Sequence, residues 1–97
     1  QIRKEEQWKN SDRNAITIFK SMMMRIVLIA LHKGAEMKKH TATGTLSLQV
    51  IEGEMQFTTD EQSIILSSGQ MLVLHVGIPH SVLAKKETIF LLTLTTE

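Results

Sequence analysis

The amino-acid sequence predicts an all-β fold of the sandwich or barrel class. Short apolar runs that are rich in β-branched residues recur along the chain, and turn residues such as Lys33-Gly34 and Ser68-Gly69 separate them. No window of about 12 residues carries a helical stripe of apolar positions. Short strands at regular spacing, with turn signals between them, are typical of β-sandwiches and β-barrels.

The chain divides into an arm and one domain. Residues 1–14 are polar, and their one large apolar side chain is Trp8. We interpret these residues as an N-terminal arm that anchors through Trp8 onto the body or onto a second subunit. The length of 97 residues suffices for one domain only, which we place at residues 15–97.

The predicted strands follow the arm in order. The first run, AITIFK, alternates apolar and polar residues, the second, MRIVLIALH, is a longer apolar stretch, and the later runs are short and end at turn residues. The strands are expected at residues 15–20, 24–32, 45–53, 54–59, 62–67, 70–76, 80–85 and 88–95.

The strand at 45–53 has a readable inward face. Leu46, Leu48 and Val50 share one face by the period of two, and we expect that face to look toward the core or a pocket. The tight reversal that follows is expected at Glu52-Gly53-Glu54, where Gly53 is free to take a positive φ.

Composition narrows the function classes. The formal net charge is +1, so strong attraction to nucleic acid or to an anionic membrane is not expected. The chain has no cysteine, which excludes disulfides, thiolate zinc sites and a cysteine nucleophile. The strongly apolar run Ile26 to Leu31 is too short to cross a bilayer. We expect a cytoplasmic protein, since the cytoplasm is the default location for such a chain.

The spacing of glycines and histidines resembles the two motifs of the cupin superfamily. In the first motif a glycine, a His-x-His pair, a glutamate and a glycine follow one another, and here Gly34, His40, Ala42, Leu46 and Gly53 stand at those positions. In the second motif Gly69, His75, Gly77, His80 and Ala84 occupy the positions of glycine, proline, glycine, histidine and asparagine. The resemblance covers about Ile26 to Leu94, most of the chain.

The resemblance implies a fold and an assembly. Cupins are double-stranded β-helices, in which two antiparallel sheets form a jelly roll that curls into a small barrel. They commonly pair as homodimers through an edge strand or the N-terminal arm, which would cover an edge that is otherwise prone to aggregation.

The departures from the family pattern concern the metal centre. Metal-bearing cupins hold iron, manganese, zinc, nickel or copper with three histidines and a glutamate, and this chain keeps only His40 and His80 at those positions. Ala42 replaces a histidine and Leu46 replaces the glutamate, which removes half of the donor set. A reorganised site of His40, His75 and His80 is an alternative, because three histidines and water suit zinc or iron.

We therefore expect a pocket in the barrel mouth that takes a small organic molecule. Its expected wall is Leu46, Leu48 and Val50, with Met71 and Val73 in addition and with His40 and His80 as polar groups. The first hypothesis is a non-catalytic binding or sensing domain with no metal. The second is a metal-dependent enzyme of the oxygenase or isomerase type, and the third is a structural dimer without a small ligand.

Overall fold

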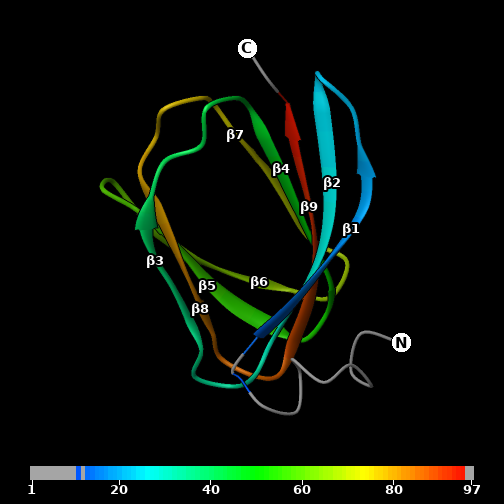
Figure 1. The fold of residues 1–97 in the computed structure, drawn as a ribbon. Helices are drawn as coiled ribbons and strands as arrows, with labels where there is room; N and C mark the ends of the chain where they lie inside the picture. The colour runs from blue at the N-terminus through cyan, green and yellow to red at the C-terminus, as the bar shows by residue number, and fades with distance from the viewer. Residues whose placement is uncertain (1–10, 12, 96–97) are drawn as a thin grey trace.

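The computed structural model describes Ser11 and residues 13–95, so the predicted arm up to residue 10, with Trp8, lies outside the described residues. Within the described part, the chain consists of strands and short turns (Figure 1). The strands are β1 (Arg13–Lys20), β2 (Met24–Leu31), β3 (Glu36–His40), β4 (Leu46–Glu52), β5 (Glu54–Thr59), β6 (Ser63–Ser67), β7 (Met71–Leu74), β8 (His80–Ala84) and β9 (Thr88–Thr95).

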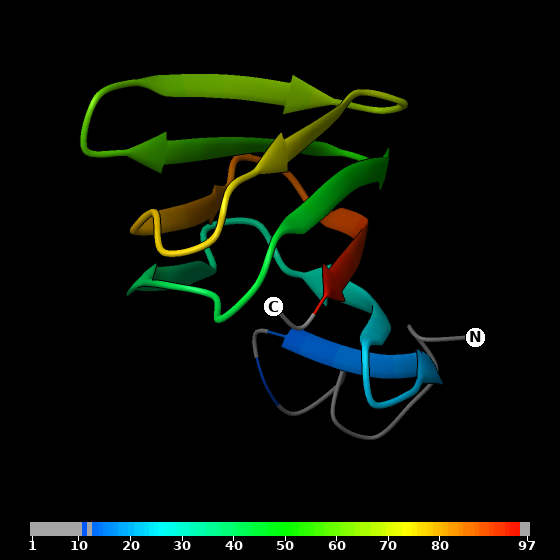
Figure 2. The same ribbon diagram turned by 90° about the horizontal axis from the view of Figure 1, so that it is seen from above.

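The strands form two antiparallel sheets that face each other (Figures 1 and 2). The larger sheet has the order β1-β2-β9-β4-β7 and the smaller one the order β3-β8-β5-β6. The chain crosses repeatedly between the sheets, as in a jelly roll. The predicted double-stranded β-helix is confirmed.

The core lies between the two sheets and follows the alternation of each strand. Its largest fully buried apolar side chains are Phe90, Leu31, Leu48, Met55 and Val50. The predicted inward face of β4 is confirmed, because Leu46, Leu48 and Val50 are all buried while Ile51 is exposed. This core contains residues of both sheets.

The reversal between β4 and β5 also agrees with the prediction. Gly53 has a φ of 105°, in the region that favours glycine. It packs against the connection between β8 and β9, where the hydroxyl of Thr88 donates to the carbonyl oxygen of Glu54 at 3.0 Å. This hydrogen bond therefore links the β4–β5 turn to the β8–β9 connection.

β1 begins at Arg13, two residues before the predicted strand and inside the predicted arm. Two other elements differ more from the expected pattern. β3 was not predicted, because its sequence EMKKH is mostly charged; it is an edge strand in which only Met37 packs on the core. β7 is shorter than expected and ends at Leu74, so that His75 lies in the loop that follows. Among the described residues, no helix is long and apolar enough to cross a membrane.

Candidate functional site

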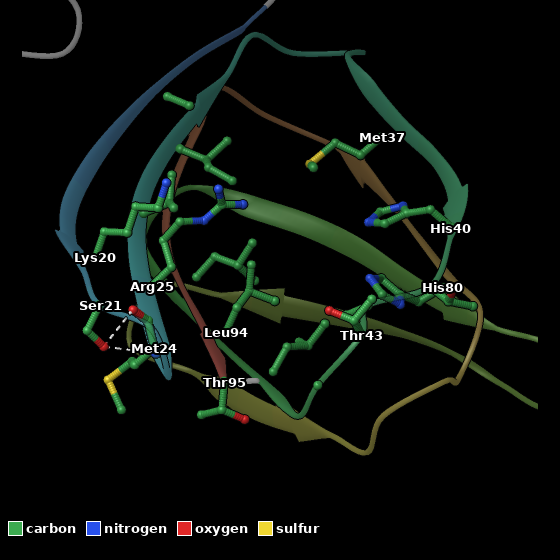
Figure 3. A pocket seen from close by; sticks show the side chains of 18 of the residues that line it. Lys20, Ser21, Met24, Arg25, Met37, His40, Thr43, His80, Leu94 and Thr95 are labelled. Atoms are coloured by element: carbon green, nitrogen blue, oxygen red, sulfur yellow. Dashed lines mark hydrogen bonds between the residues drawn. The ribbon is translucent and has the colours of Figure 1, made fainter. Parts of the chain in front are cut away.

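A cavity of about 700 Å³ opens between the two sheets at one end of the barrel (Figure 3). One wall comes from the ends of β1 and β2 and from β9, and the opposite wall comes from β3, β8 and the loop before β4. Residues that line it include Lys20, Arg25, Val27, Ile29, Met37, His40, Ala42, Thr43, Leu46, His80, Leu92 and Leu94. The predicted pocket in the barrel mouth therefore exists.

His40 and His80 lie side by side on one wall of this cavity. His40 is the last residue of β3 and His80 the first of β8, and antiparallel pairing brings the two positions into register. Their ring centroids are 4.4 Å apart, with planes tilted by 56°. His80 is almost fully buried and stacks on Phe57 with a centroid distance of 5.5 Å, whereas His40 is exposed. We call these two residues the histidine pair.

Backbone carbonyls fix the tautomer of both rings. Nδ1 of His40 lies 2.7 Å from the carbonyl oxygen of Lys38, and Nδ1 of His80 lies 3.0 Å from that of Ile78. A carbonyl oxygen only accepts, so each Nδ1 carries the proton and donates it. Each neutral ring then keeps the lone pair of Nε2 for another partner.

Burial sets the charge of His80. Loss of solvent lowers the pKa of His80 below its ordinary value; the hydrogen bond to the Ile78 carbonyl opposes this shift, and the neighbouring His40 adds to it. His80 is therefore neutral at physiological pH, and its Nε2 is an acceptor or a ligand atom.

The donor set of the metal centre implied by the motifs is incomplete here. Ala42 and Leu46 line the same cavity as the histidine pair and supply no donor atom. Within the described residues, no group of three His, Cys, Asp or Glu side chains could hold a metal ion. Two neutral imidazoles without an anionic ligand do not fit a four-ligand centre.

The alternative set with His75 is not assembled. His75 is exposed, follows the end of β7 and does not line the cavity. The loop that carries it is tied to the cavity rim at Gly77, whose N–H donates to the carbonyl oxygen of Ala42 at 3.3 Å. The alternative site of His40, His75 and His80 is therefore wrong, because His75 lies apart from the other two.

The expected hydrophobic wall holds only in part. Leu46 lines the cavity, whereas Leu48 and Val50 lie deeper in the core and do not reach it. The assignment of Met71 and Val73 to the wall is wrong, since they are 54 % and 62 % exposed.

The register between β4 and β7 explains this correction. Met71 lies opposite Gln49 and Val73 opposite Ser47, so both share the outward face of the sheet. Leu72 and Leu74 point inward instead and pack on the core.

Sequence reasoning missed the opposite wall of the cavity. Lys20 and Arg25 are directly paired across the β1–β2 hairpin and line the cavity together with Val27 and Ile29 (Figure 3). The available signal was the alternation Arg25, Val27, Ile29 along β2, which places the three side chains on one face. We call Lys20 and Arg25 the cation pair.

The comparisons with known proteins find relatives by structure. No protein-family model and no curated protein sequence matches the chain. An RmlC-like cupin from Desulfovibrio desulfuricans is similar at 28 % identity, with a TM-score of 0.77 over 86 % of this chain and 81 % of that one. A conserved protein of unknown function from Streptococcus pyogenes is similar at 25 % identity, with a TM-score of 0.83 over 88 % and 75 %.

Further structures share the fold at lower identity. A cupin superfamily protein from Desulfitobacterium hafniense has a TM-score of 0.85 at 19 % identity, over 88 % of this chain and 78 % of that one. The G106A mutant of salicylate 1,2-dioxygenase from Pseudoaminobacter salicylatoxidans has a TM-score of 0.79 at 20 % identity, and the match covers 86 % of this chain and 26 % of that one.

Three observations indicate the same fold: the jelly-roll topology, the spacing of the two motifs and the similarity to these structures. The departures at Ala42, Leu46 and Ala84 concern side chains and leave the strand order intact. The chain therefore has the cupin fold, and its sequence departs from the metal-binding motifs of that superfamily at these positions.

Proposed function

We propose that this cupin is a non-catalytic binding or sensing domain for a small organic molecule, which sits in the cavity. A concave site of several hundred Å³ with apolar walls and a few polar groups is typical of small-molecule sites. The observation that carries the proposal is Leu46, which lines the cavity where the family pattern has an anionic ligand. The space is retained while the charge that would hold a metal is lost.

A cavity-filling variant tests this proposal. Small organic compounds are screened for a rise in melting temperature, with the protein kept in chelator, and hits are repeated on Ala42→Phe. Ala42 lines the cavity, so a phenyl ring there takes up space that the ligand needs. The control is Ile51→Phe on the exposed face of β4. Hits that Ala42→Phe abolishes and Ile51→Phe keeps support the proposal. A screen that gives no such hit in chelator, and gives hits only when it is repeated with added zinc, iron, manganese or nickel, contradicts it.

A metal-dependent enzyme of the oxygenase or isomerase type is the second candidate. One observation favours it: Nδ1 of each histidine donates to a backbone carbonyl, and metal-bound histidines use the same arrangement to orient Nε2. Elemental analysis for zinc, iron, manganese and nickel decides between the two. The protein is purified without chelator, and about one metal per chain that is lost in a His40→Ala/His80→Ala variant would favour the enzyme.

We also propose that the chain works as a homodimer in the cytoplasm. The edge strand β1 supports the assembly, because Ile18 and Phe19 on it are exposed. Neither nucleic acid nor a membrane is a proposed partner, in keeping with the net charge of +1.

A further inference from the structure

The cation pair lines the cavity from two positions that are exposed to solvent. Lys20 and Arg25 are directly opposite in the antiparallel register of β1 and β2. Like charges at directly opposite positions destabilise a sheet. Both side chains line the cavity, so an anionic group bound there would lie within reach of both (Figure 3).

Among the described residues, the cavity lining contains no Asp or Glu. The ion pairs recorded for the described part of the chain lie elsewhere, between Lys39 and Asp60 and between His32 and Glu87. Within the described part of the chain, no carboxylate is therefore paired with Lys20 or Arg25, and a guanidinium matches the two oxygens of a carboxylate.

The middle of the cavity is apolar. Met37, Leu46, Leu92 and Leu94 line it together with Val27 and Ile29. The histidine pair lies on the far wall. The cavity thus offers cationic donors at one wall, a hydrocarbon surface between, and two imidazole rings opposite.

We propose that the ligand is a small organic carboxylate with an apolar body. Arg25 and Lys20 hold the carboxylate, and the body packs on Leu46, Leu94 and Met37. Two cations and a hydrocarbon lining suit one monoanionic group better than a highly charged molecule, which would need more donors. This inference rests on the proposed function, since it names the ligand class of the same cavity.

The test compares two probes of the same shape that differ in charge. Cyclohexanecarboxylate and cyclohexanecarboxamide are titrated into the full chain, and methyl NMR signals of Leu46 and Leu94 report binding inside the cavity. The variants are Arg25→Met and Lys20→Met, which keep the apolar stems. Lys86→Met is the matched control, because it removes one exposed positive charge outside the cavity.

We expect the acid to bind about tenfold more tightly than the amide, the effect of one charge-assisted contact. Arg25→Met and Lys20→Met should each lower that preference to about threefold or less, and Lys86→Met should keep it. Equal binding of acid and amide would overturn the carboxylate assignment and leave the proposed function standing. An acid preference that survives both cavity variants would overturn the role of the cation pair. Binding of neither probe in the cavity would overturn the inference and count against the proposed function as well.

Discussion

At the scale of single residues, the neutral state of His80 makes the stability of the fold depend on pH. Burial lowers the pKa of His80, while the unfolded chain binds its proton near the ordinary value of 6.5. Between these two values the unfolded state binds more protons, so the contribution of His80 to stability is full above pH 6.5 and is lost as the pH falls toward the folded pKa.

The variant His80→Gln removes this titration. We expect the melting temperature of the parent to fall more steeply than that of the variant between neutral and mildly acidic pH. Circular dichroism melts over this range measure both slopes. Parallel pH curves for the two proteins would show that His80 takes up its proton equally well in the folded and unfolded chain.

The cation pair predicts a stability gain from a substitution in the site. Removing one of two opposed charges relieves repulsion, so Arg25→Met and Lys20→Met should stabilise the ligand-free protein by a few tenths of a kcal/mol. Urea denaturation at low salt measures the change in the free energy of unfolding, and added salt should shrink it. Lys86→Met serves as the reference for a lone surface charge. A loss of stability in both cavity variants would mean that the pair contributes to the fold rather than to a ligand.

At the scale of elements, Gly53 is where the fold depends most on a missing side chain. A Cβ there would lie 2.4 Å from the carbonyl oxygen of Glu87 and 2.7 Å from the Cα of Thr88, both of which are backbone atoms. Gly34 has a similar positive φ of 89°, but a Cβ on it would meet nothing within 4 Å. An alanine at Gly34 would therefore meet backbone strain alone, whereas an alanine at Gly53 would meet backbone strain and steric overlap.

Gly34→Ala should cost roughly 1–2 kcal/mol, the strain of a positive φ alone. Gly53→Ala should cost several kcal/mol, since the β4–β5 turn must also move away from the backbone of the β8–β9 connection. Denaturant midpoints of the two variants measure the difference. Equal losses would indicate that the β8–β9 connection moves aside easily.

The elements also show what the sequence could predict. The inward face of β4 was readable because LSLQV alternates apolar and polar residues, and β7 was not readable because MLVL is apolar throughout. β3 escaped prediction because four of its five residues are charged or histidine, and its pairing with β8 is a long-range contact. Local patterns fix a strand only where one face is polar and the other is not.

At the scale of the whole molecule, the motif spacing predicted the barrel and the histidine pair, while the opposite wall of the cavity had to come from the fold. His40 and His80 are 40 residues apart by number and meet because β3 and β8 pair. The cation pair enters the cavity because β2 joins the larger sheet beside β9. A position on a strand face is a local property, whereas the cavity that this face lines depends on the packing of both sheets.

The exposed edge at β1 carries the last prediction, which concerns assembly. Ile18 and Phe19 are 56 % and 49 % exposed on an edge strand, and a second copy of the chain could extend the sheet there and cover them. We expect light scattering after size exclusion to give twice the mass of one chain.

Phe19→Lys should shift the protein toward the monomer, because a charge at an edge position opposes pairing with another strand. Ile65→Lys on the edge strand β6 of the other sheet is the control, and it should keep the dimer. A parent protein that stays monomeric at high concentration would leave β1 without this role, and a dimer that only Ile65→Lys breaks would place the interface on β6.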